Sequence, residues 1–321
     1  MTLICSGSLA YDRLLSYDGL FAESFLADRL DIINVCFVAN DLQVAFGGTA
    51  GNIAYNLGLL GEKPLVAGCL GEDPDGGEYL RRLKDQGCLT EAVKIQAGRA
   101  TAGCTIATDR HNNQLTFFHP GAMAAPSGFD PAALPRPFDQ HLAIVSPGGQ
   151  EEMKSLCQAY RELGYRFIFD PGQQIPAFSG PELTEMLEGA AIFICNEYEY
   201  DLFQKITGLS PEGIFQRAET VIVTLGAKGC DLIVPGRGSQ HLDPVPVSSV
   251  ANPTGAGDAF RAGLLKALGK PRPEHLITAC RLGATVAAFC VETEGGPQAH
   301  RFTPAQVAAR HAAAFREEIN L

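Results

Sequence analysis

The sequence predicts an α/β protein of three layers, in which helices cover both faces of a mainly parallel central sheet and a small β layer projects from the main body. Two observations support this fold class. From about residue 141, short apolar runs alternate with polar or glycine-rich turns and helical stretches. Continuous apolar runs of that length are typical of parallel strands buried on both faces. In contrast, residues 32–46 and 101–118 show the partial alternation of strands with one solvated face.

The later part of the chain supplies the strands of the predicted parallel sheet. Their apolar cores are LAIV (142–145), RFIF (166–169), AIFIC (191–195) and VIVT (221–224). The residues that follow these runs are SPGGQ, DPGQQ, NEYE and LGAKG. In open α/β sheets, ligands bind beyond the carboxyl ends of the strands. We therefore expect these four polar or glycine-rich ends to form one rim of a ligand site.

The N-terminal third supplies two helices and the small β layer. GNIAYNLGLLG (51–61) and GGEYLRRLKDQG (76–87) have helical spacing, and Gly87 ends the second helix. Residues 101–118 are a hairpin candidate that turns near Asn112-Asn113. A layer of this kind beside the strand-end rim would be positioned to act as a lid. The predicted division assigns residues 1–10, 47–96 and 122–321 to a large α/β nucleotide-binding domain, and residues 11–46 and 97–121 to a small β lid.

Composition narrows the classes of partner. The chain has 321 residues, of which 46% are hydrophobic and 19% are charged, as in a soluble protein with a sizeable core. Its formal net charge of -11 argues against nucleic acid and anionic membranes as partners, because both attract clustered Lys and Arg. The ten cysteines form no C-x-x-C pair and are expected to be reduced thiols. We find no signal peptide and no membrane-spanning run, so a cytoplasmic location is expected.

The segment ANPTGAGDAFRAGLLKAL (251–268) carries the strongest chemical signal. Thr254-Gly255-Ala256-Gly257-Asp258 opens a predicted helix, and free N–H groups at a helix start bind anions. Asp258 lies in the first turn, where we expect the helix dipole to keep its carboxylate ionised. A carboxylate beside a phosphate site is what a kinase needs to accept a hydroxyl proton. Taken alone, the segment is equally compatible with a tight turn and an ordinary first-turn acid.

Two N-terminal segments carry candidate acceptor-binding residues. In FGGTAGNIAYNLGLLG (46–61), the glycine pair permits close backbone approach and an asparagine offers a donor and an acceptor to vicinal hydroxyls. In GSLAYD (7–12), a carboxylate after the first predicted strand can accept hydrogen bonds from two ribose hydroxyls. A glycine-rich turn before a core helix and a surface acid would also explain these segments. The candidates are Gly48 and Asn52 in the first segment, and Ser8 and Asp12 in the second.

In order and spacing, these segments resemble the ribokinase-like (PfkB) family along nearly the whole chain. GGTAGNIAYNLGLLG and NPTGAGDAFRAGLL resemble its two signatures, NEYE (196–199) its N-x-x-E motif, and TLGAKG (224–229) its nucleotide-binding T-x-G-x-x-G turn. The resemblance implies a ribokinase-like three-layer α/β/α fold and a kinase that uses ATP and Mg²⁺, with a monovalent cation as a further candidate. It also implies that Asp258 is the catalytic base, beside an anion hole formed by the backbone amides of Gly255, Ala256, Gly257 and Asp258. The implied ATP-binding residues are Asn196, Thr224, Gly226, Gly229, Gly255 and Gly257, and Glu199 would hold the metal through water.

Within this family, the chain is most similar to the bacterial adenosine kinases. The phrases GSLAYDRLL, FFHPGAM, DPGQQ and GDAFRAG carry that similarity. It implies transfer of the ATP γ-phosphate to the 5′-hydroxyl of adenosine, in purine salvage, and a homodimer paired through the lid. Phe118 would stack on adenine, whereas Cys104 stands about where relatives carry a second stacking aromatic. The implied nucleoside-binding residues are Ser8, Asp12, Gly48, Asn52, Phe118 and Gln173.

Other functions remain open or are excluded on the sequence. A sugar kinase of the ribokinase or fructokinase type, or a broader nucleoside kinase, would share the fold and the catalytic loop, because these do not determine the acceptor. A non-catalytic nucleotide sensor would keep the pocket, but the presence of Asp258 and Glu199 argues against it. A dehydrogenase lacks support because no G-x-G-x-x-G follows the first strand. A P-loop NTPase is excluded because G-x-x-x-x-G-K-[ST] is absent.

Overall fold

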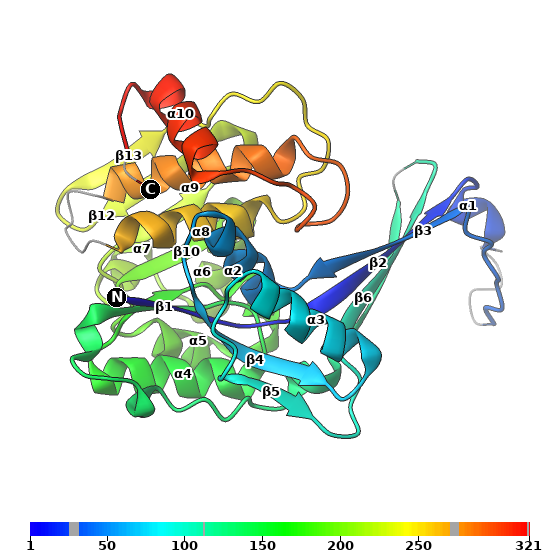
Figure 1. Cartoon of the computed structure of the whole chain (residues 1–321), viewed down its shortest axis with the longest axis horizontal. Coiled ribbons are helices and arrows are strands. Elements are labelled where there is room, and N and C mark those ends of the chain that lie inside the picture. Colours follow the sequence, from blue (N-terminus) through cyan, green and yellow to red (C-terminus); the bar gives the residue numbers. More distant parts are fainter. Residues whose placement is uncertain (26–31, 112, 270–275, 320) are drawn as a thin grey trace.

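A computed structural model describes the chain except for residues 26–31, 112, 270–275 and 320. Its main body is a large sheet between two layers of helices (Figure 1). The described residues of this sheet form nine strands in the order β13-β12-β11-β10-β9-β8-β1-β4-β5. All pairings from β11 through β5 are parallel, and only β12 and β13 at one edge are antiparallel in the part of the chain that the structure describes. The predicted three-layer class with a mainly parallel sheet is confirmed.

The four strands predicted from apolar runs are all present. They are β8 (His141–Val145), β9 (Arg166–Phe169), β10 (Ile192–Asn196) and β11 (Val221–Thr224). The other strands of the large sheet are β1 (Thr2–Ser6), β4 (Leu65–Gly71), β5 (Val93–Gln96), β12 (Cys230–Val234) and β13 (Gly238–Leu242). Because β1 lies between β8 and β4, the chain runs outward from the centre of the sheet in both directions. Ligand crevices form at the carboxyl edge of such sheets.

Alternate residues of the central strands face two separate apolar cores. Phe167, Phe169 and Phe193 pack on one side against α4 (Gln150–Leu163), α5 (Gly180–Leu187), α6 (Glu197–Thr207) and α7 (Pro211–Phe215). Ile168 and Ile194 pack on the other side against α2 (Thr49–Leu59), α8 (Ala256–Leu268) and α9 (Leu276–Val291). Helices α3 (Pro74–Asp85) and α10 (Pro304–Phe315) complete that second layer. Buried on both faces, these strands lack the alternation of a half-exposed sheet.

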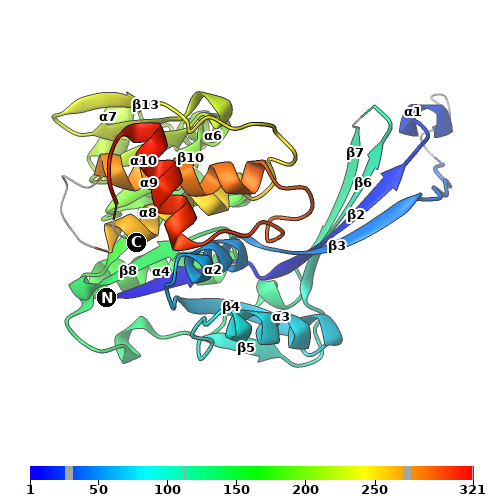
Figure 2. The same ribbon diagram turned by 45° about the horizontal axis from the view of Figure 1, so that its top comes forward.

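A smaller sheet stands away from the body, as Figure 2 shows. Its strands are β3 (Asp41–Gly47), β2 (Ala10–Tyr17), β6 (Ala102–Asp109) and β7 (Gln114–His119), in that order. Strands β6 and β7 form the predicted hairpin, and short helix α1 (Phe21–Ser24) lies at the far end of the sheet. The sheet begins where β1 ends and returns to the body where α2 begins, so it rises directly from the carboxyl edge of the large sheet.

Two details of the N-terminal third differ from the sequence prediction. Residues 32–40 are not part of a strand, because β3 starts only at Asp41. No strand was predicted over Ala10–Tyr17, yet β2 is central in the small sheet and pairs with both β3 and β6. Residues 26–31 of the predicted lid and Asn112 of the predicted turn lie outside the described residues. Among the helices that the structure describes, none is long and apolar enough to cross a membrane.

Candidate active site

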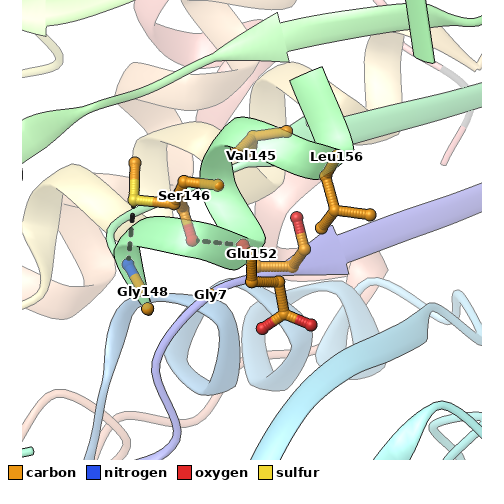
Figure 3. A pocket seen from close by; sticks show the side chains of 9 residues that line it. Gly7, Val145, Ser146, Gly148, Glu152 and Leu156 are labelled. Atoms are coloured by element: carbon orange, nitrogen blue, oxygen red, sulfur yellow. Dashed lines mark hydrogen bonds between the residues drawn. The ribbon is translucent and has the colours of Figure 1, made fainter. Parts of the chain in front are cut away.

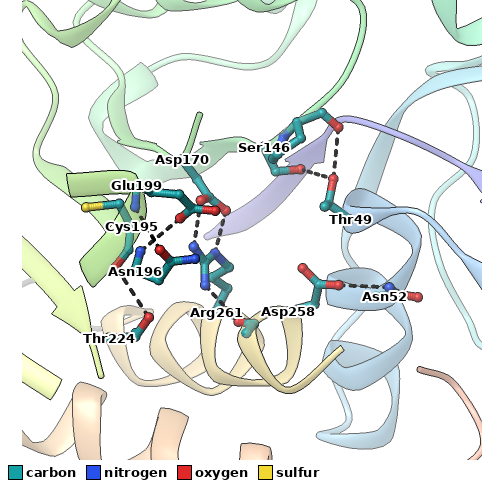
Figure 4. A network of polar contacts seen from close by, with 12 residues as sticks. Thr49, Asn52, Ser146, Asp170, Cys195, Asn196, Glu199, Thr224, Asp258 and Arg261 are labelled. Carbon is teal, nitrogen blue, oxygen red and sulfur yellow. Dashed lines mark hydrogen bonds and ion pairs between the residues drawn. The ribbon is translucent and has the colours of Figure 1, made fainter. Parts of the chain in front are cut away.

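The carboxyl edge of the large sheet brings the predicted catalytic and nucleotide-binding segments together. Asp170 follows β9, Asn196 ends β10 and Thr224 ends β11, and the start of α8 faces all three (Figure 4). Helix α2 approaches the same place from the other side and carries Asn52 toward Asp258. These strand ends therefore lie together at one edge of the sheet, as predicted.

Asp258 lies in the first turn of α8 and is partly buried. Its Oδ2 accepts a hydrogen bond from Asn52 Nδ2 at 2.8 Å. Burial raises the pKa of Asp258 to about 7, against the lowering effects of the Asn52 hydrogen bond and of the Arg261 charge. Burial thus acts against the helix dipole, which the sequence led us to expect would keep this carboxylate ionised. A carboxyl that titrates near neutrality is suited to accept a proton.

The backbone before Asp258 has the shape expected of an anion-binding turn, in which one amide N–H already donates to a backbone carbonyl. Gly255 has φ 83°, and a Cβ there would lie 2.6 Å from Cβ of Pro297, so glycine is required. The Ala256 N–H donates to the carbonyl of Pro253 at 3.1 Å. The N–H groups of Gly257 and Asp258 have no protein acceptor among the described residues. These two amides are therefore the ones open to an anion.

A buried ion pair lies directly behind this turn. Arg261 donates from Nε and Nη2 to the two oxygens of Asp170, the second at 2.7 Å, and the side chains are only 8% and 2% exposed. Arg261 Nη1 also donates to the carbonyl of Gly257 at 3.1 Å. The sequence did not indicate this pair, in which both oxygens of the Asp170 carboxylate are held by Arg261. The one available signal was an arginine inside an apolar helix, where a charge must have a partner.

The N-x-x-E segment forms a helix cap at the end of β10. Asn196 Oδ1 accepts from the Glu199 N–H at 2.8 Å, and the Glu199 carboxylate accepts from the Asn196 N–H at 2.8 Å. Burial raises the pKa of Glu199, although the Asn196 hydrogen bond acts in the opposite direction. The carboxylate retains further acceptor positions. Glu199 thus lies at the edge of the site with capacity for a water ligand.

The T-x-G-x-x-G turn follows the next strand. The Thr224 hydroxyl donates to the carbonyl of Cys195 at 3.3 Å. Gly226 and Gly229 have φ of 59° and 97°, and a Cβ at Gly229 would lie 2.1 Å from the Leu242 carbonyl oxygen. Both glycines are therefore needed for the backbone path of this turn.

The first glycine segment is braced by hydroxyl groups. Gly48 has φ 84°, and a Cβ there would lie 2.5 Å from the carbonyl oxygen of Ser8. Ser8 is buried, and its Oγ accepts from the Thr49 N–H at 2.9 Å and contacts the Thr49 hydroxyl at 3.1 Å. Thr49 contacts Ser146 in turn at 3.0 Å. Ser8 thus supports the start of α2 in this structure.

A narrow pocket behind these hydroxyls is filled by the protein itself. It lies between β1, β8 and α4, and Gly7, Ser146 and Glu152 line it (Figure 3). The Ser146 hydroxyl donates to the Ser6 carbonyl at 2.8 Å, and the buried Glu152 accepts from the Ser127 N–H at 3.0 Å. The pocket has no room for a ligand, so it is not the ligand site.

One face of the small sheet carries the remaining predicted acceptor residues. Asp12 on β2 is paired with Cys104 on β6, which is paired with Phe118 on β7, so the three side chains share a face. Asp12 lies near enough to Asp258 to raise its pKa, so this face looks toward α8. Burial raises the pKa of Asp12 itself to about 6. Phe118 is 49% exposed, and Gln173 is exposed in the turn after β9.

Comparison with known proteins agrees with this architecture. Residues 34–299 match the model of the pfkB family of carbohydrate kinases. The chain is 30% identical to nucleoside kinases of Methanothermobacter thermautotrophicus (91% of this chain, 90% of the relative) and Methanocaldococcus jannaschii (78% and 80%). The structure of Burkholderia thailandensis nucleoside kinase in complex with inosine matches with TM-score 0.85 and 36% identity, covering 99% of both chains. An Arabidopsis thaliana ribokinase, 20% identical with TM-score 0.75, shares the fold.

Fold and site together define a phosphotransferase of the ribokinase-like class. The chain belongs to the pfkB family, and it is a kinase that transfers phosphate to a hydroxyl group of a nucleoside or a sugar. A second structure of the Burkholderia thailandensis nucleoside kinase is a complex with ADP-inosine, and the Arabidopsis thaliana ribokinase structure contains ribose and ATP.

Proposed function

We propose that this kinase phosphorylates the 5′-hydroxyl of purine nucleosides, adenosine among them, with ATP as donor. The observation that carries the proposal is the row Asp12–Cys104–Phe118 on the face of the small sheet that looks toward Asp258. Neighbouring strands lie about 4.8 Å apart, so Asp12 and Phe118 are separated by ~10 Å across the sheet. A free sugar bound at Asp12 is too small to contact Phe118, whereas the base of a nucleoside bound there can reach it. That spacing favours a nucleoside over a free sugar.

In the proposed reaction, Asp258 is the general base. A sugar hydroxyl is a poor nucleophile, so a carboxylate removes its proton as the new P–O bond forms and ADP leaves. Asp12, Asn52 and the Gly48 backbone hold the ribose, and Ser8 supports them through Thr49. Phe118 stacks on one face of the base, with Gln173 nearby.

The donor is proposed to lie along the ends of β10 and β11. The Gly255, Ala256 and Gly257 turn receives the transferred phosphate, with the Gly257 and Asp258 amides open in advance and the Ala256 amide released from Pro253 on binding. Asn196, Thr224, Gly226 and Gly229 surround the rest of the nucleotide. Glu199 keeps free carboxylate oxygen positions, which fit a water ligand of Mg²⁺. When bound, the metal offsets phosphate charge.

Residues 11–46 and 97–121 are proposed to act as a lid over the acceptor, with residues 1–10, 47–96 and 122–321 as the body. The base of the lid is tied to the body by Tyr11 and Arg13, which hydrogen-bond to Asp75 at the start of α3. Closure would exclude water that otherwise accepts the phosphate.

Two copies are proposed to pair through the lid. Its face opposite Asp12 leaves Leu42 and Val44 each 56% exposed and Phe117 70% exposed. Pairing of this face would remove those side chains from water. Sedimentation at micromolar concentration should show a dimer that Phe117→Asp converts to a monomer. A wild-type monomer would end this part of the proposal.

A panel of acceptors tests the substrate assignment. Adenosine, inosine, other nucleosides, ribose and fructose would be compared with ATP-Mg²⁺ by ADP release. We expect purine nucleosides to exceed free sugars in kcat/KM by roughly 10- to 100-fold or more, since aromatic stacking on a base contributes ~1–3 kcal/mol. If ribose or fructose exceeds every nucleoside, the chain is a sugar kinase instead.

A further inference from the structure

A chain of hydrogen bonds leads from the body of the protein to Asp258. It begins at Arg82 on α3, whose Nε donates to Gln298 Oε1 at 2.9 Å and whose Nη2 donates to the Gln298 carbonyl at 3.2 Å. The Arg82 guanidinium is held in place between two rings, 4.4 Å from the centroid of Phe46 and 5.1 Å from that of Tyr55. This arginine is therefore a fixed donor at one end of the chain.

The next two links are amides. Gln298 Nε2 donates to Asn52 Oδ1 at 3.1 Å and to the Tyr79 hydroxyl at 3.2 Å. Asn52 Nδ2 then donates to Asp258 Oδ2 at 2.8 Å. Gln298 and Asn52 are only 5% and 4% exposed, so water cannot replace these partners.

The direction of the chain is set at the arginine. A guanidinium has donors and no acceptor, so Gln298 must turn its oxygen toward Arg82 and its nitrogen toward Asn52. Asn52 must then use its oxygen for Gln298, which leaves only its nitrogen for Asp258. A donor at that position favours the ionised carboxylate, whereas an acceptor would require a proton on Asp258.

We propose that Arg82 and Gln298 are positioning residues that fix the Asn52 amide and thereby keep Asp258 in the form that accepts a proton. The inference rests on the proposed role of Asp258 as base. Neither residue touches Asp258, and their effect passes through the orientation of one amide. The same orientation determines which atom of the Asn52 amide faces the bound nucleoside.

The other charged and titratable groups around Asp258 stay in place when Gln298 is changed. They are Arg261 on the same helix, Asp170 after β9, Asp12 on β2 and the Cys290 thiol on α9. Around Gln298 itself, Arg301 Nη1 donates to its backbone carbonyl at 3.1 Å, a contact that no side-chain substitution removes. A change in the titration of Asp258 would therefore report on the amide chain.

The test is the pH dependence of kcat/KM in Gln298→Glu and Gln298→Met. Glutamate keeps the bond to Arg82 but has no donor for Asn52, so the Asn52 amide turns and presents its oxygen to Asp258. We expect the acidic limb of the profile to move about one pH unit upward, which is a loss of about tenfold at pH 6 that is recovered by pH 9. Gln298→Met adds no charge and removes the donor that fixes the Asn52 amide, so both amide orientations become accessible. The limb should then move in the same direction but by less, which separates amide orientation from the charge of glutamate.

Tyr79→Phe is the control in the same cluster. It removes the other acceptor of Gln298 Nε2 and the hydrogen bond to the Gly47 carbonyl, but leaves the chain to Asp258 intact, so the limb should not move. Should a Gln298 variant fail to fold, Arg82→Met perturbs the other end of the same series of hydrogen bonds, and its pH profile of kcat/KM provides the same test. A loss of activity that is uniform in pH, or an unmoved limb in folded variants, overturns the positioning role. Retained turnover in Asp258→Asn would instead overturn the base assignment, so the two failures are distinct.

Discussion

Replacing Asp258 by asparagine should abolish most turnover and at the same time stabilise the folded protein. Asparagine keeps the shape of the side chain and an oxygen for the Asn52 donor, but it cannot accept a proton. We expect kcat to fall ~10²–10⁴-fold, with smaller changes in the affinity for nucleoside and ATP. A loss of function coupled to a gain in stability is expected where a buried carboxyl is retained for chemistry.

The gain in stability follows from the pKa of Asp258. Burial raises this pKa from an ordinary 3.8 to about 7, so between these pH values the folded state holds a proton that the unfolded state has released. The free energy of unfolding of the wild type therefore falls as pH rises through that window. The full difference corresponds to ~4 kcal/mol as an upper bound, and because the carboxyl is partly exposed we expect about 2 kcal/mol. Asp258→Asn lacks this cost. Its gain in the free energy of unfolding over the wild type should therefore be greatest above pH 7 and vanish near pH 4.

Asp170→Asn is the matched comparison in the same site and should have the opposite effect on stability. It removes one partner from the buried pair with Arg261, which costs about 3–5 kcal/mol. Thermal unfolding of both variants at pH 5 and pH 8, alongside steady-state rates, is the assay. Equal melting temperatures of Asp258→Asn and wild type at pH 8, together with retained turnover, would refute both the burial argument and the base assignment.

Three further outcomes are expected. Phe118→Ala should raise the KM for purine nucleosides roughly tenfold and leave that for ribose unchanged, as measured by initial rates. Gly47→Ala places a Cβ 2.4 Å from Oδ2 of Asp12 and should raise the nucleoside KM but not the ATP KM, whereas Gly77→Ala, which meets nothing within 4 Å, should change neither. Replacing K⁺ by a bulky organic cation should change kcat less than about twofold, because Asn252 already bridges its loop to the Gly295 carbonyl at 2.6 Å.

The large sheet was predictable because its strands carry a local signal. Runs such as those of β8 to β11 are apolar on both faces, and each is followed by a polar turn. Strand β2 was not predictable in this way. Its sequence AYDRLLSY has Leu14 and Leu15 in adjacent positions, and most of its residues are half-buried. It therefore shows neither a continuous apolar run nor a regular alternation. Its position in the centre of the small sheet depends on strands more than 20 residues away.

The individual site residues were predictable where a backbone motif marks them, and their partners were not. The glycines before Asp258 indicate the start of a helix. The hydrogen bond between Asn52 and Asp258, however, joins residues 206 positions apart, and that between Gln298 and Asn52 joins residues 246 positions apart. Arg261 and Asp170 are 91 residues apart. No local pattern encodes such pairs, because they arise when separate strand ends and helix starts converge. Gln298 in particular lies in a loop, GGPQAH, that carries no motif.

The electrostatics of the site link donor binding to the state of the base. Three carboxyl groups there have pKa values raised by burial, Asp12 to about 6, Asp258 to about 7, and Glu199 in the same direction. A further anion beside them raises these values again, so ATP bound without metal should draw a proton onto Asp258 and remove the base. Calorimetry in buffers of different ionisation enthalpy measures this directly. We expect proton uptake at pH 7 when ATP binds alone, less uptake with Mg²⁺, and none attributable to Asp258 in Asp258→Asn, whereas equal uptake in all three would contradict the coupling.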